Sequence, residues 1–96
     1  MKKSIITDDE TRCFVCGSSY RLERHHCIHG TSGRKLADKY GLTVPLCFEC
    51  HRGTEGVHGR DGAELDLELK QIAQRKWEDK HGGREAWLRV FGKSYL

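Results

Sequence analysis

The stretch Cys13-Phe14-Val15-Cys16 and its counterpart Leu46-Cys47-Phe48-Glu49-Cys50-His51 decide the fold of this 96-residue chain. Each contains a CxxC turn, which places two thiolates within reach of one ion, and 30 residues separate the two turns. Structural zinc sites are usually closed by four ligands in a tetrahedron, often thiolates. The spacing therefore predicts one structural Zn²⁺ site, with the ligands Cys13, Cys16, Cys47 and Cys50.

The composition favours such a metal staple. Hydrophobic residues make up 36% of the chain and aromatic residues 8%, so a single domain spanning residues 1–96 would bury only a limited core. The cysteine count of five is odd, and the charged segment 1–10 lacks the apolar run of a signal peptide. We therefore expect an intracellular, cytoplasmic protein with metal-bound cysteines, and no apolar run reaches the length of a membrane span.

The remaining cysteine, Cys27, is expected to be a small buried residue rather than a ligand. The competing interpretation of the cysteines is a redox CxxC motif. Because a redox motif needs only one pair, the presence of two pairs favours zinc.

Local patterns predict an α+β fold in two parts, a metal core over residues 12–59 and a helical extension over residues 61–96. In the core we expect a hairpin or bent strand at 20–29, a helix at 32–40 capped by Ser32 and ended by Gly41, a strand at 42–46 with Pro45 at an edge, and a helix from 48 to 53 that carries Cys50 and His51.

The extension should contain two helices. The first is expected at 61–81, after a capping-box-like start from Asp61 to Glu64, and the second at 84–91. The apolar stripe of the longer helix is expected to face the core and comprises Leu65, Leu69, Ile72, Ala73, Lys76 and Trp77.

Four histidines are threaded through the cysteine-bearing region. His25 and His26 lie between the two CxxC turns, His51 follows the second turn directly, and His58 comes seven residues later. Neighbouring side chains on a strand point to opposite faces, so one of the pair can bind a metal while the other faces a substrate. Three imidazoles with an open coordination position are typical of a catalytic metal site. His29 and His81 are expected to lie outside the site.

Arg24-His25-His26 after a CxxC turn, followed by residues 46–51 and then His58, resembles the HNH endonuclease family. More narrowly, the pattern is similar to the small zinc-stapled HNH proteins of phages and prophages. The resemblance covers residues 12–59 and implies a ββα-metal (His-Me finger) core, to which the two C-terminal helices are added. It also implies a metal-dependent enzyme that hydrolyses phosphodiester bonds in DNA.

The resemblance implies specific roles for the histidines. His26 would be the general base, and His25, His51 and His58 would hold a divalent metal, for which Mg²⁺ is expected and Mn²⁺, Ni²⁺ or Zn²⁺ are alternatives. An unperturbed imidazole has a pKa of about 6.5, which suits proton abstraction from water near neutral pH.

The chain departs from the family pattern in two respects. It contains no asparagine, although the family usually has one on the strand before the second CxxC turn, near Leu42 or Thr43 here. The gap between His51 and His58 is also longer than usual, and Glu55 within it is an alternative third ligand.

The net charge of +3 arises in the metal-bearing half, where residues 1–60 carry 10 basic and 7 acidic side chains. This excess is compatible with a polyanionic partner. Arg24 and Arg52 adjoin proposed site histidines and are the predicted nucleic-acid contacts. The resemblance implies DNA as the partner, together with phage packaging or recombination proteins, and no membrane association.

Two other functions remain as alternatives. One is a non-catalytic zinc-ribbon module that binds nucleic acid, which the missing asparagine favours. The other is a zinc-stapled protein-interaction domain that docks a partner through its C-terminal helices. A purely structural zinc protein has no need of His25, His26 and His58, so these histidines favour the nuclease.

Overall fold

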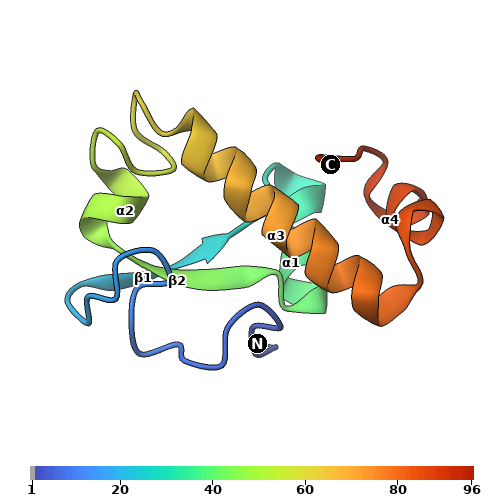
Figure 1. Ribbon diagram of the computed structural model, residues 1–96, viewed down its shortest axis with the longest axis horizontal. Coiled ribbons are helices and arrows are strands. Elements are labelled where there is room, and N and C mark those ends of the chain that lie inside the picture. The colour runs from blue at the N-terminus through green and yellow to red at the C-terminus, as the bar shows by residue number, and fades with distance from the viewer. Residues whose placement is uncertain (1) are drawn as a thin grey trace.

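A computed structural model describes residues 2–96, and over this range the chain forms a two-stranded sheet and four helices (Figure 1). In order, the elements are β1 (Leu22–His26), α1 (Thr31–Tyr40), β2 (Thr43–Cys47), α2 (Phe48–Arg52), α3 (Ala63–His81) and α4 (Arg84–Phe91). The predicted α+β class and the two added C-terminal helices are confirmed. Within residues 2–96, no helix has the length and apolar character needed to cross a bilayer.

The sheet fixes where the histidine pair and the second CxxC turn lie. β1 and β2 are antiparallel, and their register pairs Leu22 with Cys47 and His26 with Thr43. α1 forms the connection between the strands, and α2 follows β2 without a break, so that Cys47 is both the last strand residue and the N-cap of the helix. All five residues of β2 are buried.

The core joins both halves of the chain. β2 and the residue before it contribute Leu42, Val44 and Leu46, which form one cluster with buried residues of the helices: Ala37, Leu69, Ala73, Trp77 and Trp87. In Figure 1, α3 crosses obliquely over the strands, with α2 near one end of the molecule and α4 near the other. The C-terminal extension is therefore packed into the same core as the metal-bearing half.

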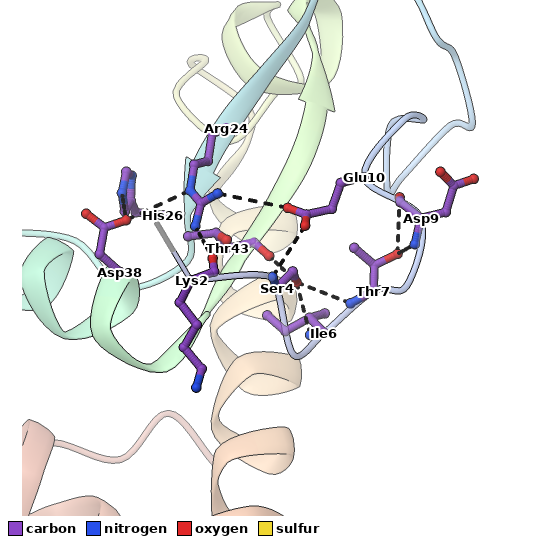
Figure 2. Close-up of polar contacts among 10 residues, drawn as sticks. All are labelled: Lys2, Ser4, Ile6, Thr7, Asp9, Glu10, Arg24, His26, Asp38 and Thr43. Atoms are coloured by element: carbon purple, nitrogen blue, oxygen red, sulfur yellow. Dashed lines mark hydrogen bonds and ion pairs between the residues drawn. The ribbon is translucent and has the colours of Figure 1, made fainter.

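The N-terminal segment is tied to the fold by hydrogen bonds to the turn after α1 and to β2. The Ile5 N–H donates to the Gly41 carbonyl at 2.9 Å, and the Ser4 hydroxyl donates to the Thr43 carbonyl at 2.5 Å (Figure 2). Gly41 ends α1 with a φ of +73°, and a Cβ there would collide with the Lys3 carbonyl. A glycine is needed at this turn both for its conformation and for this close approach.

Three details of the helices differ from expectation. Gly30, not Ser32, is the N-cap of α1, and no side chain caps that helix. α3 begins at Ala63 after Gly62, so Asp61 does not cap it. In the apolar stripe of α3, Lys76 is exposed and Gln74 is buried in its place. The buried amide of Gln74 is satisfied because its oxygen accepts a hydrogen bond from the Tyr95 N–H of the C-terminal segment, at 2.7 Å.

Trp87 is the largest fully buried side chain, and its ring stacks on Phe91 with centroids 3.8 Å apart. We expect Trp87→Ala to lower the free energy of unfolding by about 3–5 kcal/mol, since it leaves a large cavity. Leu88→Ala on the same helix, where the side chain is 42% exposed, should change it by only about 0.5 kcal/mol. Urea unfolding of the zinc-loaded proteins measures both, and equal losses would contradict this view of the core.

Candidate metal centres

The four cysteines predicted as zinc ligands come together. The sulfur atoms of Cys13, Cys16, Cys47 and Cys50 all lie within 4.8 Å of one another, and none forms a disulfide. The Cys16 and Cys47 sulfurs are 3.5 Å apart. This cluster can hold a structural metal such as zinc, because four thiolates around one point are the donor set of a closed zinc site.

Backbone hydrogen bonds set the shape of the first CxxC turn and dock it on the sheet. The Cys13 N–H donates to the Ser18 carbonyl at 2.7 Å, and the Gly17 N–H donates to the Cys13 carbonyl at 2.9 Å. The Phe14 N–H then donates to the Pro45 carbonyl of β2 at 2.8 Å. The first cysteine pair is thus brought to the junction of β2 and α2, where the second pair lies.

The cysteines differ in how readily they ionise. Burial opposes ionisation of Cys13, but hydrogen bonds from the backbone N–H groups of Cys16, Cys47 and Val15 outweigh it and lower its pKa to about 6. Burial and the neighbouring thiols raise the pKa of Cys50. Cys27 is fully buried and its pKa is raised by burial to about 12, which confirms it as a buried, unreactive residue outside the cluster.

A second cluster is built around His25. Its side chain is 1% exposed, and one ligand nitrogen from each of His25, His51 and His58 lies within 4.8 Å of the others. The Nε2 atom of His25 is buried without a hydrogen-bond partner in the protein, a state that costs about 1–3 kcal/mol unless something satisfies it. Burial lowers the pKa of His25 to about 3, so the imidazole is neutral and keeps a lone pair for a metal.

A glycine-rich loop after α2 accounts for the long gap between His51 and His58. The Gly56, Gly59 and Gly62 N–H groups each donate to the carbonyl three residues earlier, which forms successive tight turns. A Cβ at Gly59 would collide with the Gly53 carbonyl. These turns bring the His58 N–H to the His51 carbonyl, to which it donates with an N to O distance of 3.0 Å.

The alternative third ligand, Glu55, lies elsewhere. It lines a separate depression beside Cys50 and Asp61, whereas His58 joins His25 and His51. The loop thus separates the two candidates that the sequence left open. Burial also lowers the pKa of His58, which keeps this imidazole neutral.

His51 is oriented by a carboxylate from β1. Its Nδ1 lies 2.8 Å from Glu23 Oε1, and the Arg52 Nε–H donates to the same oxygen at 2.8 Å. The hydrogen bonds from His51 and then Arg52 lower the pKa of Glu23. With Nδ1 engaged, the Nε2 atom of His51 is left for a metal, an arrangement common among metal-bound histidines.

His26 points away from His25, as expected for neighbours on a strand. Its Nε2 lies 2.9 Å from Asp38 Oδ1 of α1, and Figure 2 shows the two side chains facing each other. The Arg24 Nε is 3.8 Å from the same oxygen, and an Arg24 Nη2–H donates to the Lys2 carbonyl at 2.8 Å. No sequence pattern pointed to Asp38, because only the packing of α1 beside β1 brings it to His26.

His29, which received no role from the sequence, lies beside this cluster and belongs to a second ligand group that shares His25. Its Nε2 is 2.5 Å from Asp66 Oδ1 of α3, and His25, His29 and Asp66 also offer ligand atoms within 4.8 Å of one another. The presence of three histidines within residues 25–29 was the signal that could have drawn attention to it. Asp66 had no signal, since it lies 37 residues away on the helical extension.

These histidines open into one pocket of about 430 Å³, which has room for an ion and a phosphate group. It is lined only by imidazoles and guanidinium groups, from His25, His26, His29, His51, His58, Arg24, Arg34 and Arg52. Of the two predicted nucleic-acid contacts, Arg52 is 57% exposed, whereas Arg24 is 25% exposed and held by intramolecular contacts. Arg34 on α1 is a further exposed residue at this rim.

Comparison of the chain with known protein families, with curated proteins and with solved structures finds no match.

The cysteine cluster predicts how the fold depends on zinc. Cys50→Ser should lose the bound zinc and much of the helical signal, because metal binding and folding are coupled at such sites. Cys27→Ala should keep one cysteine-bound zinc per chain. The zinc released when a mercurial blocks the thiols measures the metal content of each variant, and circular dichroism measures its helix content. Full zinc retention and an unchanged fold in Cys50→Ser would contradict the four-cysteine site.

Proposed function

We propose that this protein is a metal-dependent endonuclease of the HNH type, which hydrolyses phosphodiester bonds in DNA. One observation supports this most strongly. A group of three imidazoles able to bind a metal (His25, His51 and His58) and a separate, carboxylate-held imidazole (His26) open into the same arginine-lined pocket. The pocket therefore combines a metal site, a base and an anion-binding rim.

The order of the elements also supports the proposal. β1, β2 and α2 follow the order of the two strands and the helix in a ββα-metal motif, with the histidine pair on β1 and His51 on α2. The departure from that motif is α1, which is inserted between the strands. It also supplies Asp38, which takes the place of the absent asparagine as the group that orients His26.

The contact with Asp38 assigns the two nitrogens of His26. In the neutral ring, Nε2–H donates to the carboxylate, which leaves the Nδ1 lone pair to accept a proton. As Nδ1 takes a proton from a water molecule, the water oxygen bonds to phosphorus and the bond from phosphorus to the 3′ oxygen breaks. The leaving 3′ oxygen takes its proton from solvent, and His26 later returns its own to solvent.

His25, His51 and His58 would hold the divalent ion, and the unpaired Nε2 of His25 fits this role because it is buried and neutral. When bound, the ion supplies positive charge that offsets the charge developing on the phosphate and on the leaving oxygen. Glu23 keeps the ring of His51 in one orientation, so that its ligand nitrogen faces the centre.

The rim of the pocket suits a polyanion. Arg52 and Arg34 are exposed, and phosphate contacts of this kind position a nucleic acid without reading its sequence. Arg24 has a different place in the proposal, because its guanidinium links Asp38 to the N-terminal segment (Figure 2). The alternative, a non-catalytic module that binds nucleic acid, would use the same rim without His26.

The base assignment predicts that His26→Ala lowers the rate of supercoiled-plasmid cleavage by about 10²–10⁴-fold, the usual contribution of a general base. Each of a series of divalent metals is added, and the cysteine-bound zinc is measured in every protein. His81→Ala is the matched control, since His81 is an exposed histidine outside the pocket and cleavage should be unchanged. Absence of cleavage by the wild type with every metal would move the assignment to the binding module.

Because Asp38 is proposed to orient His26, the effects of substituting Asp38 and His26 on the cleavage rate should not be additive. Asp38→Ala should slow cleavage by a smaller factor than His26→Ala, and the double variant should be no slower than His26→Ala alone, because the carboxylate acts through the imidazole. Asp79→Ala, an exposed carboxylate on α3, is the control. Independent, multiplying effects of the two substitutions would show that Asp38 has another function.

A further inference from the structure

We propose that His29 is a fourth imidazole ligand of the ion held by His25, His51 and His58, that Asp66 of α3 orients it, and that this donor set selects Zn²⁺, Co²⁺ or Ni²⁺ over Mg²⁺. The inference rests on the metal site of the proposed function and adds a ligand from outside the ββα core. His29 and Asp66 have no other role in the proposed chemistry.

The first support is the arrangement of the rings. The His25 ring centroid lies 5.4 Å from that of His29, 5.3 Å from that of His51 and 5.4 Å from that of His58. The His29 and His58 centroids are 5.6 Å apart, and those of His51 and His58 are 4.7 Å apart. His29 is thus as close to His25 as the other two rings are, and it belongs to the same cluster.

The second support is the carboxylate behind His29. The Nε2 of His29 is engaged by Asp66, which leaves Nδ1 for a metal, just as Glu23 engages Nδ1 of His51 and leaves Nε2. Metal-bound histidines usually donate their other N–H to such a group. The other oxygen of Asp66 lies 2.8 Å from Lys70 Nζ, and this ion pair helps to fix the carboxylate behind His29.

The third support is the position of His25. It belongs both to the group with His51 and His58 and to the group with His29 and Asp66, and its buried Nε2 has no other partner. The lone pair of one imidazole nitrogen binds a single ion. His25 is common to both groups, and in this proposal they share the one ion that its Nε2 faces.

The donor set then determines the kind of ion. Mg²⁺ prefers oxygen ligands and keeps several waters, whereas imidazole suits Zn²⁺, Ni²⁺ and Cu²⁺. Asp66 is the one carboxylate in the ligand groups around His25, and its two oxygens are already engaged by His29 and by Lys70 at 2.5 and 2.8 Å. Four imidazole nitrogen donors therefore favour a transition ion, and the Mg²⁺ expected from the family resemblance is the weaker candidate.

The test is isothermal titration with Co²⁺, Ni²⁺ and Mg²⁺ in turn, on protein that carries one equivalent of Zn²⁺ in the cysteine site and none in the histidine site. We expect one further site per chain that binds Co²⁺ and Ni²⁺ and has little affinity for Mg²⁺. Asp66→Asn should weaken the Co²⁺ affinity by about 10–100-fold, the usual effect of losing a group behind a ligand. His29→Ala should weaken it at least as much, and should shift the visible absorption of the bound Co²⁺.

Two controls share the chemistry of these residues. His26→Ala removes a histidine of the same pocket whose Nε2 is held by Asp38, and Asp79→Asn removes an exposed carboxylate of the same helix. Both should bind Co²⁺ as the wild type does, and circular dichroism with cysteine-bound zinc verifies the fold of each variant.

The outcomes separate this inference from the proposed function. Wild-type Co²⁺ affinity and spectrum in folded His29→Ala would overturn the fourth ligand, whether or not the protein cleaves DNA. Tighter binding of Mg²⁺ than of Co²⁺ would overturn the selectivity. Loss of Co²⁺ affinity in His29→Ala would support the ligand even if the wild type cut no DNA, in which case the nuclease proposal alone would fail.

Discussion

The convergence of four sulfur atoms at the junction of β2 and α2 is the constraint on which the other features depend. The first CxxC turn reaches this junction through the hydrogen bond from Phe14 to Pro45, and Cys47 and Cys50 meet it from the end of the strand and the first turn of the helix. A metal bound there would fix the direction in which α2 leaves the sheet. A five-residue helix is too short to be stable by itself, so its orientation must come from such a tether.

The two centres share this short helix. Cys50 belongs to the sulfur cluster, and the next residue, His51, belongs to the imidazole cluster. A change in the first centre would therefore alter the second. Each of the three histidines that is paired with a carboxylate receives it from a different element: Glu23 from β1 for His51, Asp38 from α1 for His26, and Asp66 from α3 for His29. The orientation of these rings is therefore set by carboxylates on separate elements. The residues next to each histidine in the sequence do not determine it.

The parts that the sequence predicted are those governed by local spacing. The CxxC turns, the strand after Gly41 and the helix that carries His51 depend on residues close together in the chain, and the structure contains them. Asp38 and Asp66 escaped prediction because they meet their histidines across 12 and 37 residues of sequence. The ends of α1 and α3 escaped it because Gly30 and Gly62 act as caps through backbone conformation, without the side-chain cap that the patterns indicated.

The pairing of β1 with β2 has a further consequence for the chemistry. His25 and His26 have the same side chain, and only the alternation of the strand gives them different surroundings. A slip of one residue in the register would turn His26 inward to His51 and His58, and His25 outward to Asp38, because such a slip reverses every side chain of a strand. The register that pairs Leu22 with Cys47 and His26 with Thr43 therefore determines which of the two histidines faces inward. In the proposed function, the different roles of the two histidines therefore follow from the strand alignment and not from residue type.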